Sequence, residues 1–461
     1  MLSAIPHEVL AVCQRLSQAG HAAFIVGGSV RDIIIGRIPG DFDVATSAHP
    51  EATLRLFGNR FAIPTGLQHG TVTVLAGEAG AQRHVEVTTF RGEGAYLDGR
   101  RPSTVTFSAT LDEDLSRRDF TMNAIAYDPA SGTIVDPFDG RGDIARKLVR
   151  TVGDPVLRFT EDGLRPMRGV RQAAQLGFSL DADTAAAIPR TLDSFRKVSA
   201  ERIRDELCKL LLAPVPSRGL DAMRVTGLLA EVLPELLPTI GCVQNRFHKH
   251  DVYTHILATV DAANPEFIVR MAALLHDLGK PRTQAPREDA PGEFSFFHHE
   301  QVGVEMAEAI CTRLRLSAAE RTTICGLVSG HMFFYTPDWT DGTVRRFVRR
   351  VGPELVPMLF ALREADIASR GQGEDRESET RELRARIARV AADDAALRVN
   401  DLVIDGRDVM RILGTPPGRR VGEILEKLLE KVLDDPALNE RETLERLVRE
   451  AAVPTAGRSP G

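Results

Sequence analysis

The sequence predicts an α+β chain, with a small mixed-sheet head followed by an all-helical remainder. Three observations support this fold class. Short runs of strand-forming residues at 23–26, 71–75 and 84–88 alternate with helical patterns in the first segment. From about Asp154 onward the apolar residues recur almost wholly with helical spacing. A chain of 461 residues, of which 43% are hydrophobic, is also too long for one ordinary domain.

We expect four parts along the chain. A head spans 1–150, a helical neck 151–225, a helical body 226–370 and a helical tail 371–461, with glycines at the last boundary. No signal-peptide pattern or bilayer-length apolar run is present, so we expect a cytoplasmic protein without membrane contact. The five cysteines form no C-x-x-C pair, which argues against a disulfide framework or a thiolate zinc site.

The formal net charge of −6 excludes a strongly basic coat for nucleic acid. Any contact with nucleic acid therefore has to rely on local positive patches. One candidate is the arginine cluster at 345–350. The solvated face of a helix explains such a cluster equally well, and the sequence leaves both interpretations open.

In the head, the segment Phe24–Asp32 predicts a strand, a tight glycine turn and the start of a helix, with Ser29 available as the N-cap. Gly27 and Gly28 allow the backbone to approach a triphosphate closely, and the helix start offers unpaired N–H groups. Arg31 can add a charged contact through two N–H donors. A glycine turn alone is weak evidence, because most are purely structural.

Two carboxylates follow this turn at a spacing that suits one metal site. Asp41 and Asp43 are two residues apart, so on a strand they point to the same face. Glu86, in a later strand-like run, is a candidate third carboxylate. Such oxygen ligands suit magnesium, and two ions can activate an attacking hydroxyl and neutralise a leaving pyrophosphate. An isolated Asp-x-Asp is more often structural, but the neighbouring glycine turn favours a site.

Five motifs, in this order, resemble the signature of class II tRNA nucleotidyltransferases and bacterial poly(A) polymerases. They are Gly27-Gly28-Ser29-Val30-Arg31-Asp32, Asp41-Phe42-Asp43-Val44-Ala45-Thr46, Arg117-Arg118-Asp119-Phe120-Thr121-Met122-Asn123-Ala124, Glu161-Asp162-Gly163-Leu164-Arg165 and Ser199-Ala200-Glu201-Arg202-Ile203-Arg204-Asp205-Glu206-Leu207. The resemblance implies a polymerase-beta-like head that adds CMP and AMP from CTP and ATP to the 3′ end of tRNA and releases pyrophosphate. It implies a catalytic role for Asp41 and Asp43, with Mg²⁺ on these two aspartates, and Glu86, from its strand-like run, is the third expected catalytic carboxylate. It also implies nucleotide binding by Gly27, Gly28, Arg31, Arg118, Asp119, Asn123, Asp162, Arg165, Arg168 and Arg171.

The Glu161–Arg165 motif also has a physical interpretation. Helical spacing predicts that its acid and its guanidinium share one face, where they can pair with the edge of a base. Cytosine and adenine both present an amine beside a ring-nitrogen acceptor, so Asp162 with Arg165 can accept both. Pro166 is unusual at this place, but the first turn of a helix tolerates proline.

The sequence leaves more than one product open. A Gly- and Arg-rich segment at 89–102 predicts a mobile loop. In the family that the motifs resemble, an intact loop accompanies addition of the final A, which favours CCA addition, or A addition alone, over CC addition. Polyadenylation also stays open. A hypothesis of another class is a metal-dependent phosphohydrolase whose head only senses nucleotide, and a third is an RNA-binding scaffold without catalysis.

The body carries a second group of candidate ligands. An adjacent His-Asp pair, with further histidines and an aspartate from other segments, suits an octahedral site for manganese, nickel, magnesium or iron. The pattern resembles the HD phosphohydrolase superfamily. The resemblance implies His255, His276, Asp277 and Asp366 as core ligands, with His299 and His331 for a second ion, and a divalent metal such as Mn²⁺ or Ni²⁺. Packing without metal is the alternative, and the sequence does not decide whether His298 or His299 faces inward.

The tail predicts two amphipathic helices at 421–433 and 440–451, after a segment that is similar to the tRNA-handling tail of HD-bearing family members. Arg419, Arg420, Lys427 and Lys431 can meet phosphates, although such helices more often simply pack. The oligomeric state is not indicated.

Overall fold

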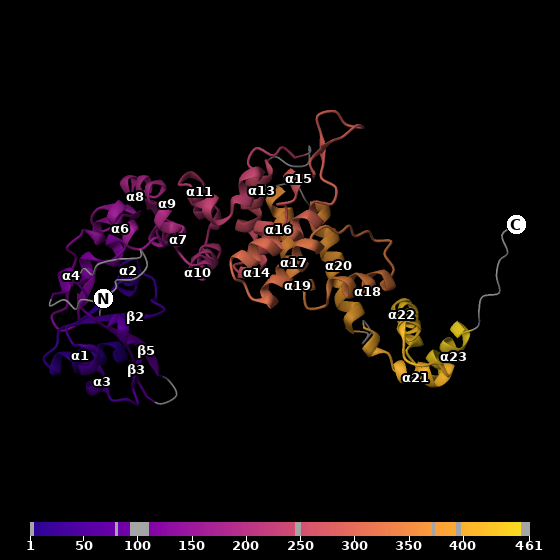
Figure 1. The fold of residues 1–461 in the computed structure, drawn as a ribbon, viewed down its shortest axis with the longest axis horizontal. Coiled ribbons are helices and arrows are strands. Elements are labelled where there is room, and N and C mark those ends of the chain that lie inside the picture. Colours follow the sequence, from indigo (N-terminus) through magenta and orange to yellow (C-terminus); the bar gives the residue numbers. More distant parts are fainter. Residues whose placement is uncertain are drawn as a thin grey trace. The chain divides into compact units, whose positions relative to one another are not determined.

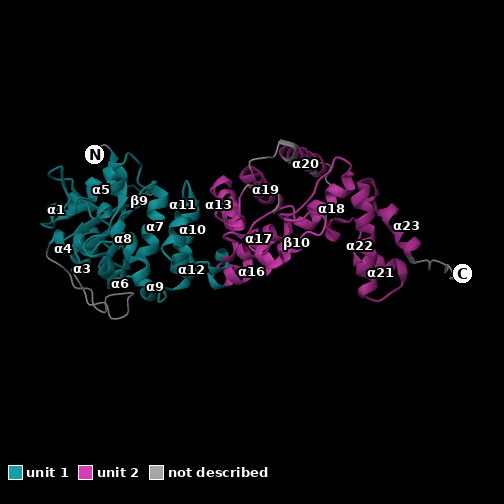
Figure 2. Cartoon of the chain, turned by 90° about the horizontal axis from the view of Figure 1, so that it is seen from above, with its two compact units in different colours: residues 1–237, 313–315 teal, residues 238–312, 316–461 magenta. Residues whose placement is uncertain are grey.

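The computed structural model describes residues 4–78, 82–92, 110–244, 250–370, 374–392 and 398–452. The chain divides into two compact units, which Figure 2 shows in two colours. Unit 1 is Met1–Leu237 with Arg313–Arg315, and unit 2 is Pro238–Thr312 with Leu316–Gly461. The finer division into four parts stays a prediction. Among the described helices, none is long and apolar enough to cross a bilayer.

Unit 1 is built on a mixed sheet, whose described strands number seven and follow the order β3-β4-β5-β2-β1-β6-β7. Their bounds are β1 (Ala23–Val26), β2 (Phe42–Thr46), β3 (Ala62–Gly66), β4 (Thr71–Ala76), β5 (Arg83–Thr89), β6 (Ala126–Asp128) and β7 (Thr133–Val135). β2 and β5 are parallel, and the other neighbours are antiparallel. The predicted α+β class with a mixed-sheet head is confirmed.

Three of these strands have little sequence signal. The strands expected at 23–26, 71–75 and 84–88 are β1, β4 and β5, whereas β3, β6 and β7 were missed. β3 contains Pro64 and Gly66, which an edge strand tolerates. β6 and β7 are three residues each, too short for an alternating pattern to show.

Helices of unit 1 cover the sheet and then continue away from it along the chain (Figure 1). α1 (His7–Gln18) and α3 (Pro50–Phe57) pack on the sheet, α2 (Gly28–Ile34) and α4 (Leu111–Ser116) lie between its strands in the chain, and α5 (Gly140–Arg146) follows β7. The helical part comprises α6 (Pro155–Glu161), α7 (Arg165–Leu176), α8 (Ala182–Ala187), α9 (Leu192–Phe195), α10 (Ala200–Leu211), α11 (Pro216–Val225) and α12 (Leu228–Val232), with a two-residue pair of β8 (Leu148–Val149) and β9 (Ser179–Leu180). Asp154 starts α6 by accepting a hydrogen bond from Leu157 N at 2.9 Å. α7 packs against α10 and α11.

Unit 2 is almost entirely helical. Its elements are α13 (Val252–Ala262), α14 (Phe267–Leu275), α15 (Lys280–Thr283), β10 (Ala285–Pro286), β11 (Phe294–Ser295), α16 (His299–Arg313), α17 (Ala318–Gly330), α18 (Asp341–Val351), α19 (Val356–Arg370), α20 (Glu374–Ala392), α21 (Gly406–Leu413), α22 (Arg419–Asp434) and α23 (Arg441–Ala452). α13 and α14 pack against each other and against α19, and α14 also contacts α17. Asp251 caps α13, and a capping box at Ser317 and Glu320 starts α17.

The two amphipathic helices expected in the tail are α22 and α23. Together with α21 they enclose an apolar cluster that includes Leu428, Leu429 and Val448. The arginine cluster at 345–350 lies on α18, which packs on α22. Arg346 pairs with Glu430 and Asp434, and Arg349 pairs with Glu426 and Glu430. Pairing with a neighbouring helix was neither of the two interpretations left open for this cluster, and it is what the structure shows for these two arginines.

Candidate active site and a second histidine cluster

A cavity of about 620 Å³ in unit 1 gathers every residue that the sequence singled out in the head. Those lining it are Gly27, Gly28, Arg31, Asp41, Asp43, Glu86, Arg118, Asp119, Asn123, Asp162, Arg165, Arg168 and Arg171. Further polar residues that the sequence did not single out as site residues also line the cavity, among them Arg91, Asp114, Arg117 and Gln172. Of the loop expected at 89–102, residues 93–102 lie outside the described part of the chain.

The parallel strands β2 and β5 bring two carboxylates together. Asp43 and Glu86 are direct partners in the strand register, so their side chains lie on the same face. Asp41 immediately precedes β2. Burial, followed by the charges of Asp41 and Glu86, raises the pKa of Asp43 to about 6. Carboxylates that repel one another in this way are a donor set that fits a divalent cation such as Mg²⁺.

The glycine turn lies directly against these carboxylates. Gly27 has a φ of +78°, and a Cβ there would lie 2.9 Å from Arg118 Nη1 and 3.6 Å from Asp43 Oδ2. The expectation that Ser29 caps the helix is wrong. α2 begins at Gly28 with Gly27 as its N-cap, so Ser29 already lies inside the first turn, where its hydroxyl donates to Val26 O at 3.1 Å.

Arg31 is held by two amide side chains from other parts of unit 1. Its Nη1 donates to Asn123 Oδ1 at 2.7 Å and to Gln172 Oε1 at 3.2 Å. Asn123 Nδ2 in turn donates to Gln172 Oε1 at 3.0 Å and to Asp119 Oδ1 at 3.1 Å. This network ties α2, the 3₁₀ turn Thr121–Asn123 and α7 together at the cavity wall. The sequence offers no signal for Gln172 beyond its place next to Arg171.

Asp114 is a buried carboxylate that positions arginines of the cavity. Its Oδ2 accepts from Arg118 Nη2 at 3.1 Å, and its Oδ1 accepts from the backbone N–H of Arg91 at 3.2 Å. Arg118 Nε is buried and has no hydrogen-bond partner among the described residues. An anionic ligand in the cavity would satisfy this donor. The spacing of Asp114 and Arg118, four residues apart, was the available sequence signal.

Asp119 holds Arg168 of α7 in place at the cavity wall. Its Oδ2 accepts from Arg168 Nε at 2.9 Å and from Arg168 Nη2 at 2.7 Å. Burial alone would raise the pKa of this carboxyl, but Arg168 and Asn123 hold the pKa below its usual range. Arg171, one turn further along α7, pairs with Glu206 of α10 at 2.7 Å. Both guanidinium groups are therefore oriented by carboxylates.

The expectation that the Glu161–Arg165 motif forms one face of a continuous helix is wrong. α6 ends at Glu161, Asp162 is extended, and α7 begins at Arg165, with Pro166 in its first turn as expected. Arg165 pairs with Glu161 at 2.6 Å, whereas Asp162 Oδ2 accepts from Arg202 Nη2 of α10 at 2.8 Å.

A tight turn causes this break in the helix. Arg165 N donates to Asp162 O and Leu164 N donates to Asp162 Oδ1. Asp162 and Arg165 still line one cavity, but each has a different partner. Arg202 lay in a quoted motif, yet nothing in the sequence paired it with Asp162.

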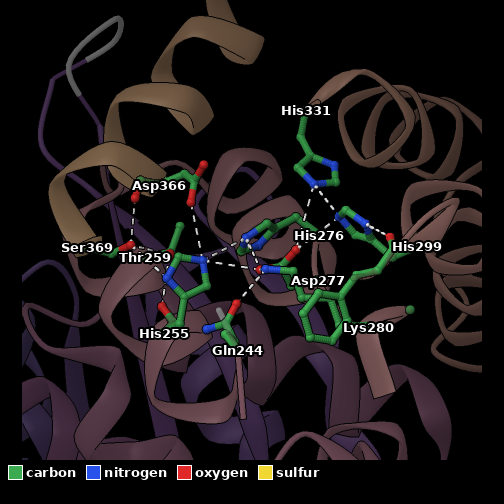
Figure 3. A network of polar contacts seen from close by, with 12 residues as sticks. Gln244, His255, Thr259, His276, Asp277, Lys280, His299, His331, Asp366 and Ser369 are labelled. Carbon is green, nitrogen blue, oxygen red and sulfur yellow. Dashed lines mark hydrogen bonds and ion pairs between the residues drawn. The ribbon is translucent and has the colours of Figure 1, made fainter. Parts of the chain in front are cut away.

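In unit 2, the candidate metal ligands are all buried and four histidines converge on one aspartate (Figure 3). Asp277 Oδ2 lies 3.2 Å from His255 Nε2 and 3.1 Å from His276 Nε2. Asp277 Oδ1 lies 3.4 Å from His299 Nε2 and 3.8 Å from His331 Nε2. The donors form two groups that can each hold a cation, His255–His276–Asp277 and Asp277–His299–His331. Asp277 belongs to both groups.

The opposite ring nitrogens explain why the Nε2 atoms face inward. His276, His299 and His331 each have Nδ1 within 2.8 Å of a backbone carbonyl three residues earlier. Such contacts need a proton on Nδ1 and leave Nε2 as a lone-pair donor in the neutral ring. Burial lowers the pKa of His331 to about 3. His299, not His298, faces the centre: His298 is exposed with a φ of +63°.

Asp366 lies beside this centre but in neither group of donors. Its Oδ1 is 3.2 Å from His255 Nε2. The same carboxylate is held by Arg370, four residues later on α19. Asp366 as a ligand therefore stays a prediction. Lys280, missed as part of the site, is buried and donates to Asp277 Oδ2 at 2.6 Å and to Gln244 Oε1 at 2.7 Å.

The fold and the cavity together define a nucleotidyltransferase, with three carboxylates at the parallel strand pair and arginines around them. Family models agree along the chain. Residues 23–150 match the poly A polymerase head domain, residues 177–239 the probable RNA and SrmB-binding site of polymerase A, and residues 252–391 the HD domain.

The chain belongs to the family of CCA-adding enzymes, nucleotidyltransferases that act on tRNA. It is 32% identical to the CCA-adding enzyme of Streptococcus gordonii over 96% of this chain and 97% of that protein. It is 49% identical to the CCA-adding enzyme of Geobacillus stearothermophilus, over 48% of this chain and 54% of the relative. Membership implies use of a divalent metal such as Mg²⁺.

A solved structure extends the likeness to the whole chain. The CCA-adding enzyme of Bacillus stearothermophilus in complex with CTP is 30% identical and aligns with a TM-score of 0.74, over 96% of this chain and 97% of that one. The predicted family, fold class and activity are confirmed by these comparisons.

Proposed function

We propose that this protein synthesises or repairs the 3′ CCA end of tRNA, adding CMP and AMP from CTP and ATP. The observation that carries the proposal is the single cavity that collects the carboxylates, the glycine turn and the arginines of α7. The curated relatives are CCA-adding enzymes, which favours full CCA addition over A addition alone or polyadenylation. Since tRNA and both nucleotides occur in the cytoplasm, we also propose that location.

Within the cavity, Asp41, Asp43 and Glu86 would hold Mg²⁺, which activates the terminal hydroxyl of tRNA and neutralises the departing pyrophosphate. The Gly27–Gly28 backbone and Arg118 would bind the triphosphate, supported by the buried Nε of Arg118 that no described residue satisfies. Asp119 would act through Arg168 rather than on the nucleotide itself, since protein donors already engage both of its oxygens.

Base selection would fall to Asp162 and Arg165. Asp162 presents an acceptor and Arg165 presents donors, and both line the cavity. Cytosine and adenine share an exocyclic amine next to a ring-nitrogen acceptor, and uracil and guanine do not. The structure adds that each side chain is fixed by its own partner, Arg202 and Glu161. Positions held in this way suit a protein template that is rigid before the nucleotide binds.

The test of the catalytic assignment is Asp43→Ala. We expect incorporation of CMP and AMP to fall by at least about a thousandfold, with the circular dichroism spectrum unchanged. Asp112→Ala, an exposed position on α4 that does not line the cavity, is the matched control and should keep full activity. Retained turnover in Asp43→Ala would refute the metal assignment.

A second activity is favoured by one observation in unit 2, the convergence of four Nε2 atoms on the two oxygens of Asp277. We propose that His255, His276, Asp277, His299 and His331 bind divalent transition metal ions such as Mn²⁺ or Ni²⁺, with Asp366 as a further ligand. The bound metal would lower the pKa of a water molecule for attack on a phosphoester, such as a 2′,3′-cyclic end.

Metal analysis of the purified protein tests this second activity. We expect bound metal in the wild-type protein, its loss in Asp277→Asn, and metal-dependent hydrolysis of a 2′,3′-cyclic phosphate that Asp43→Ala leaves intact. Absence of metal together with absence of hydrolysis across several divalent ions would mean that the histidines only pack the body.

A further inference from the structure

Arg370 engages both oxygens of Asp366. Its Nε donates to Oδ1 at 3.0 Å, and its Nη2 donates to Oδ1 at 2.9 Å and to Oδ2 at 2.6 Å. The carboxylate is buried, and the arginine side chain is 13% exposed. Close pairing of this kind between buried charges is strong, because little water is present to replace either partner.

The oxygen that Arg370 holds most fully is the one that faces the histidines. Asp366 Oδ1 lies 3.2 Å from His255 Nε2 and accepts two of the three hydrogen bonds from Arg370. A divalent ion that takes Asp366 as a ligand beside His255 needs this oxygen. The ion and the guanidinium therefore compete for the same lone pairs.

The charges around the centre add a second argument. Each of its two carboxylates already has a cationic partner: Lys280 pairs with Asp277, and Arg370, with the more distant Arg363 at 3.8 Å, pairs with Asp366. Two divalent ions would bring four positive charges against two carboxylates, and these three side-chain cations would add to that excess. A guanidinium displaced from Asp366 would remain tethered at the centre with free N–H donors, in a field that attracts anions.

We propose that Arg370 switches partners: a divalent ion displaces it from Asp366, and the freed guanidinium then binds the phosphoryl group of the ligand of this centre. This inference rests on the proposed metal site. Arg370 therefore lowers the affinity of the centre for the metal ion and raises its affinity for phosphate. If Arg370 only supported the fold, its replacement would weaken the binding of both the metal ion and the phosphate.

The first measurement is Mn²⁺ affinity in the full chain, from the free-ion signal in electron paramagnetic resonance. Asp277→Asn serves to subtract sites outside this centre. We expect Arg370→Gln to bind the more weakly held of the two ions at least about tenfold more tightly than the wild type, with Arg370→Lys between them. Arg346→Gln, which removes an arginine paired on α18 elsewhere in unit 2, is the matched control and should match the wild type.

The second measurement is binding of inorganic phosphate to the Mn²⁺-loaded proteins by calorimetry. Here Arg370→Gln should bind about tenfold more weakly than the wild type. Tighter metal with weaker phosphate supports the proposal, whereas weakening of both, or no change in either, overturns it. If neither wild type nor Arg370→Gln binds more Mn²⁺ than Asp277→Asn, the metal centre itself is refuted as well. Metal binding without an effect of Arg370→Gln refutes only the partner switch.

Discussion

Asp43 lies in an environment unlike that of an ordinary surface aspartate. Burial and the neighbouring carboxylates raise its pKa to about 6 from 3.8. Between about pH 4 and pH 6 the folded protein therefore binds more protons at this site than the unfolded chain does. The free energy of unfolding contributed by Asp43 falls as the pH rises through this window. A cation bound to the carboxylates would relieve the repulsion.

We accordingly predict that Asp43→Asn stabilises the protein in the presence of a chelator. At pH 7.5 its free energy of unfolding should exceed that of the wild type by about 1–3 kcal/mol. At pH 4 the two should unfold alike. Thermal unfolding as a function of pH measures both, with Asp183→Asn on the exposed face of α8 as the control. A variant less stable than the wild type at pH 7.5 would contradict the argument.

For individual residues, the sequence predicted which side chains gather in the cavity, but not how they pair. Asp41 and Asp43 were identifiable because their spacing on a strand is fixed by local geometry. Arg202 and Gln172 were not, because their partners lie in other elements. Arg370 lies four residues after Asp366 on α19, a helical spacing that the sequence does contain. The expectation of one helical face for the Glu161–Arg165 motif failed because the helix stops between these two residues.

At the scale of elements, the contact between α7 and α10 fixes the groups proposed to select the base. Asp162 precedes α7, and its carboxylate is held by Arg202 of α10 at 2.8 Å. Arg171 of α7 is held by Glu206 of the same helix. Helix α10 thus orients Asp162 and Arg171 on the cavity wall, although Arg202 itself does not line the cavity.

We predict that Arg202→Gln loosens base selection more than it slows catalysis. Asp162 loses its charged partner and can turn away from the base, so misincorporation of UMP should rise about tenfold or more relative to CMP, while Asp43 and Glu86 are untouched. Competition between CTP and UTP on tRNA lacking its CCA end gives this ratio. Arg204→Gln, on the same helix but outside the cavity, should behave as wild type. Unchanged selectivity in Arg202→Gln would refute the role of α10.

Helices α18 and α22 show why a charge pattern alone cannot define a binding surface. In the sequence the cluster at 345–350 suited phosphates as well as it suited a solvated helix. Arg346 and Arg349 pair with acidic residues of α22 about 80 positions later. The amphipathic pattern of α22 predicted its helix correctly, but which charged face meets a neighbour depends on tertiary packing.

For the whole molecule, contact with tRNA needs positive charge that protein carboxylates do not already neutralise. Arg420, Lys427 and Lys431 are exposed on α22, and none has an ion-pair partner in the described part of the chain. Their spacing puts them on one face of the helix. Because the chain has a formal net charge of −6, electrostatic attraction to tRNA has to come from local rows of basic residues such as this one.

We predict that replacing Arg420, Lys427 and Lys431 together by glutamine weakens tRNA binding and flattens its salt dependence. Each lost phosphate contact reduces the magnitude of the slope of log affinity against log salt by about 0.7–0.9, so three lost contacts should reduce it by about 2–3. Arg346→Gln with Arg349→Gln, which removes paired arginines, should leave the slope unchanged. Binding isotherms at several salt concentrations measure both, and an equal effect of the two sets would contradict this surface.

The most direct test of the central claim is the product made by the wild-type protein. A tRNA that ends just before its CCA sequence is incubated with the protein, Mg²⁺ and CTP, ATP or both. Product length is then read at single-nucleotide resolution. We predict two additions with CTP alone and three with both nucleotides, after which extension stops at CCA. Incorporation from ATP only, or tails of many adenosines, would contradict it.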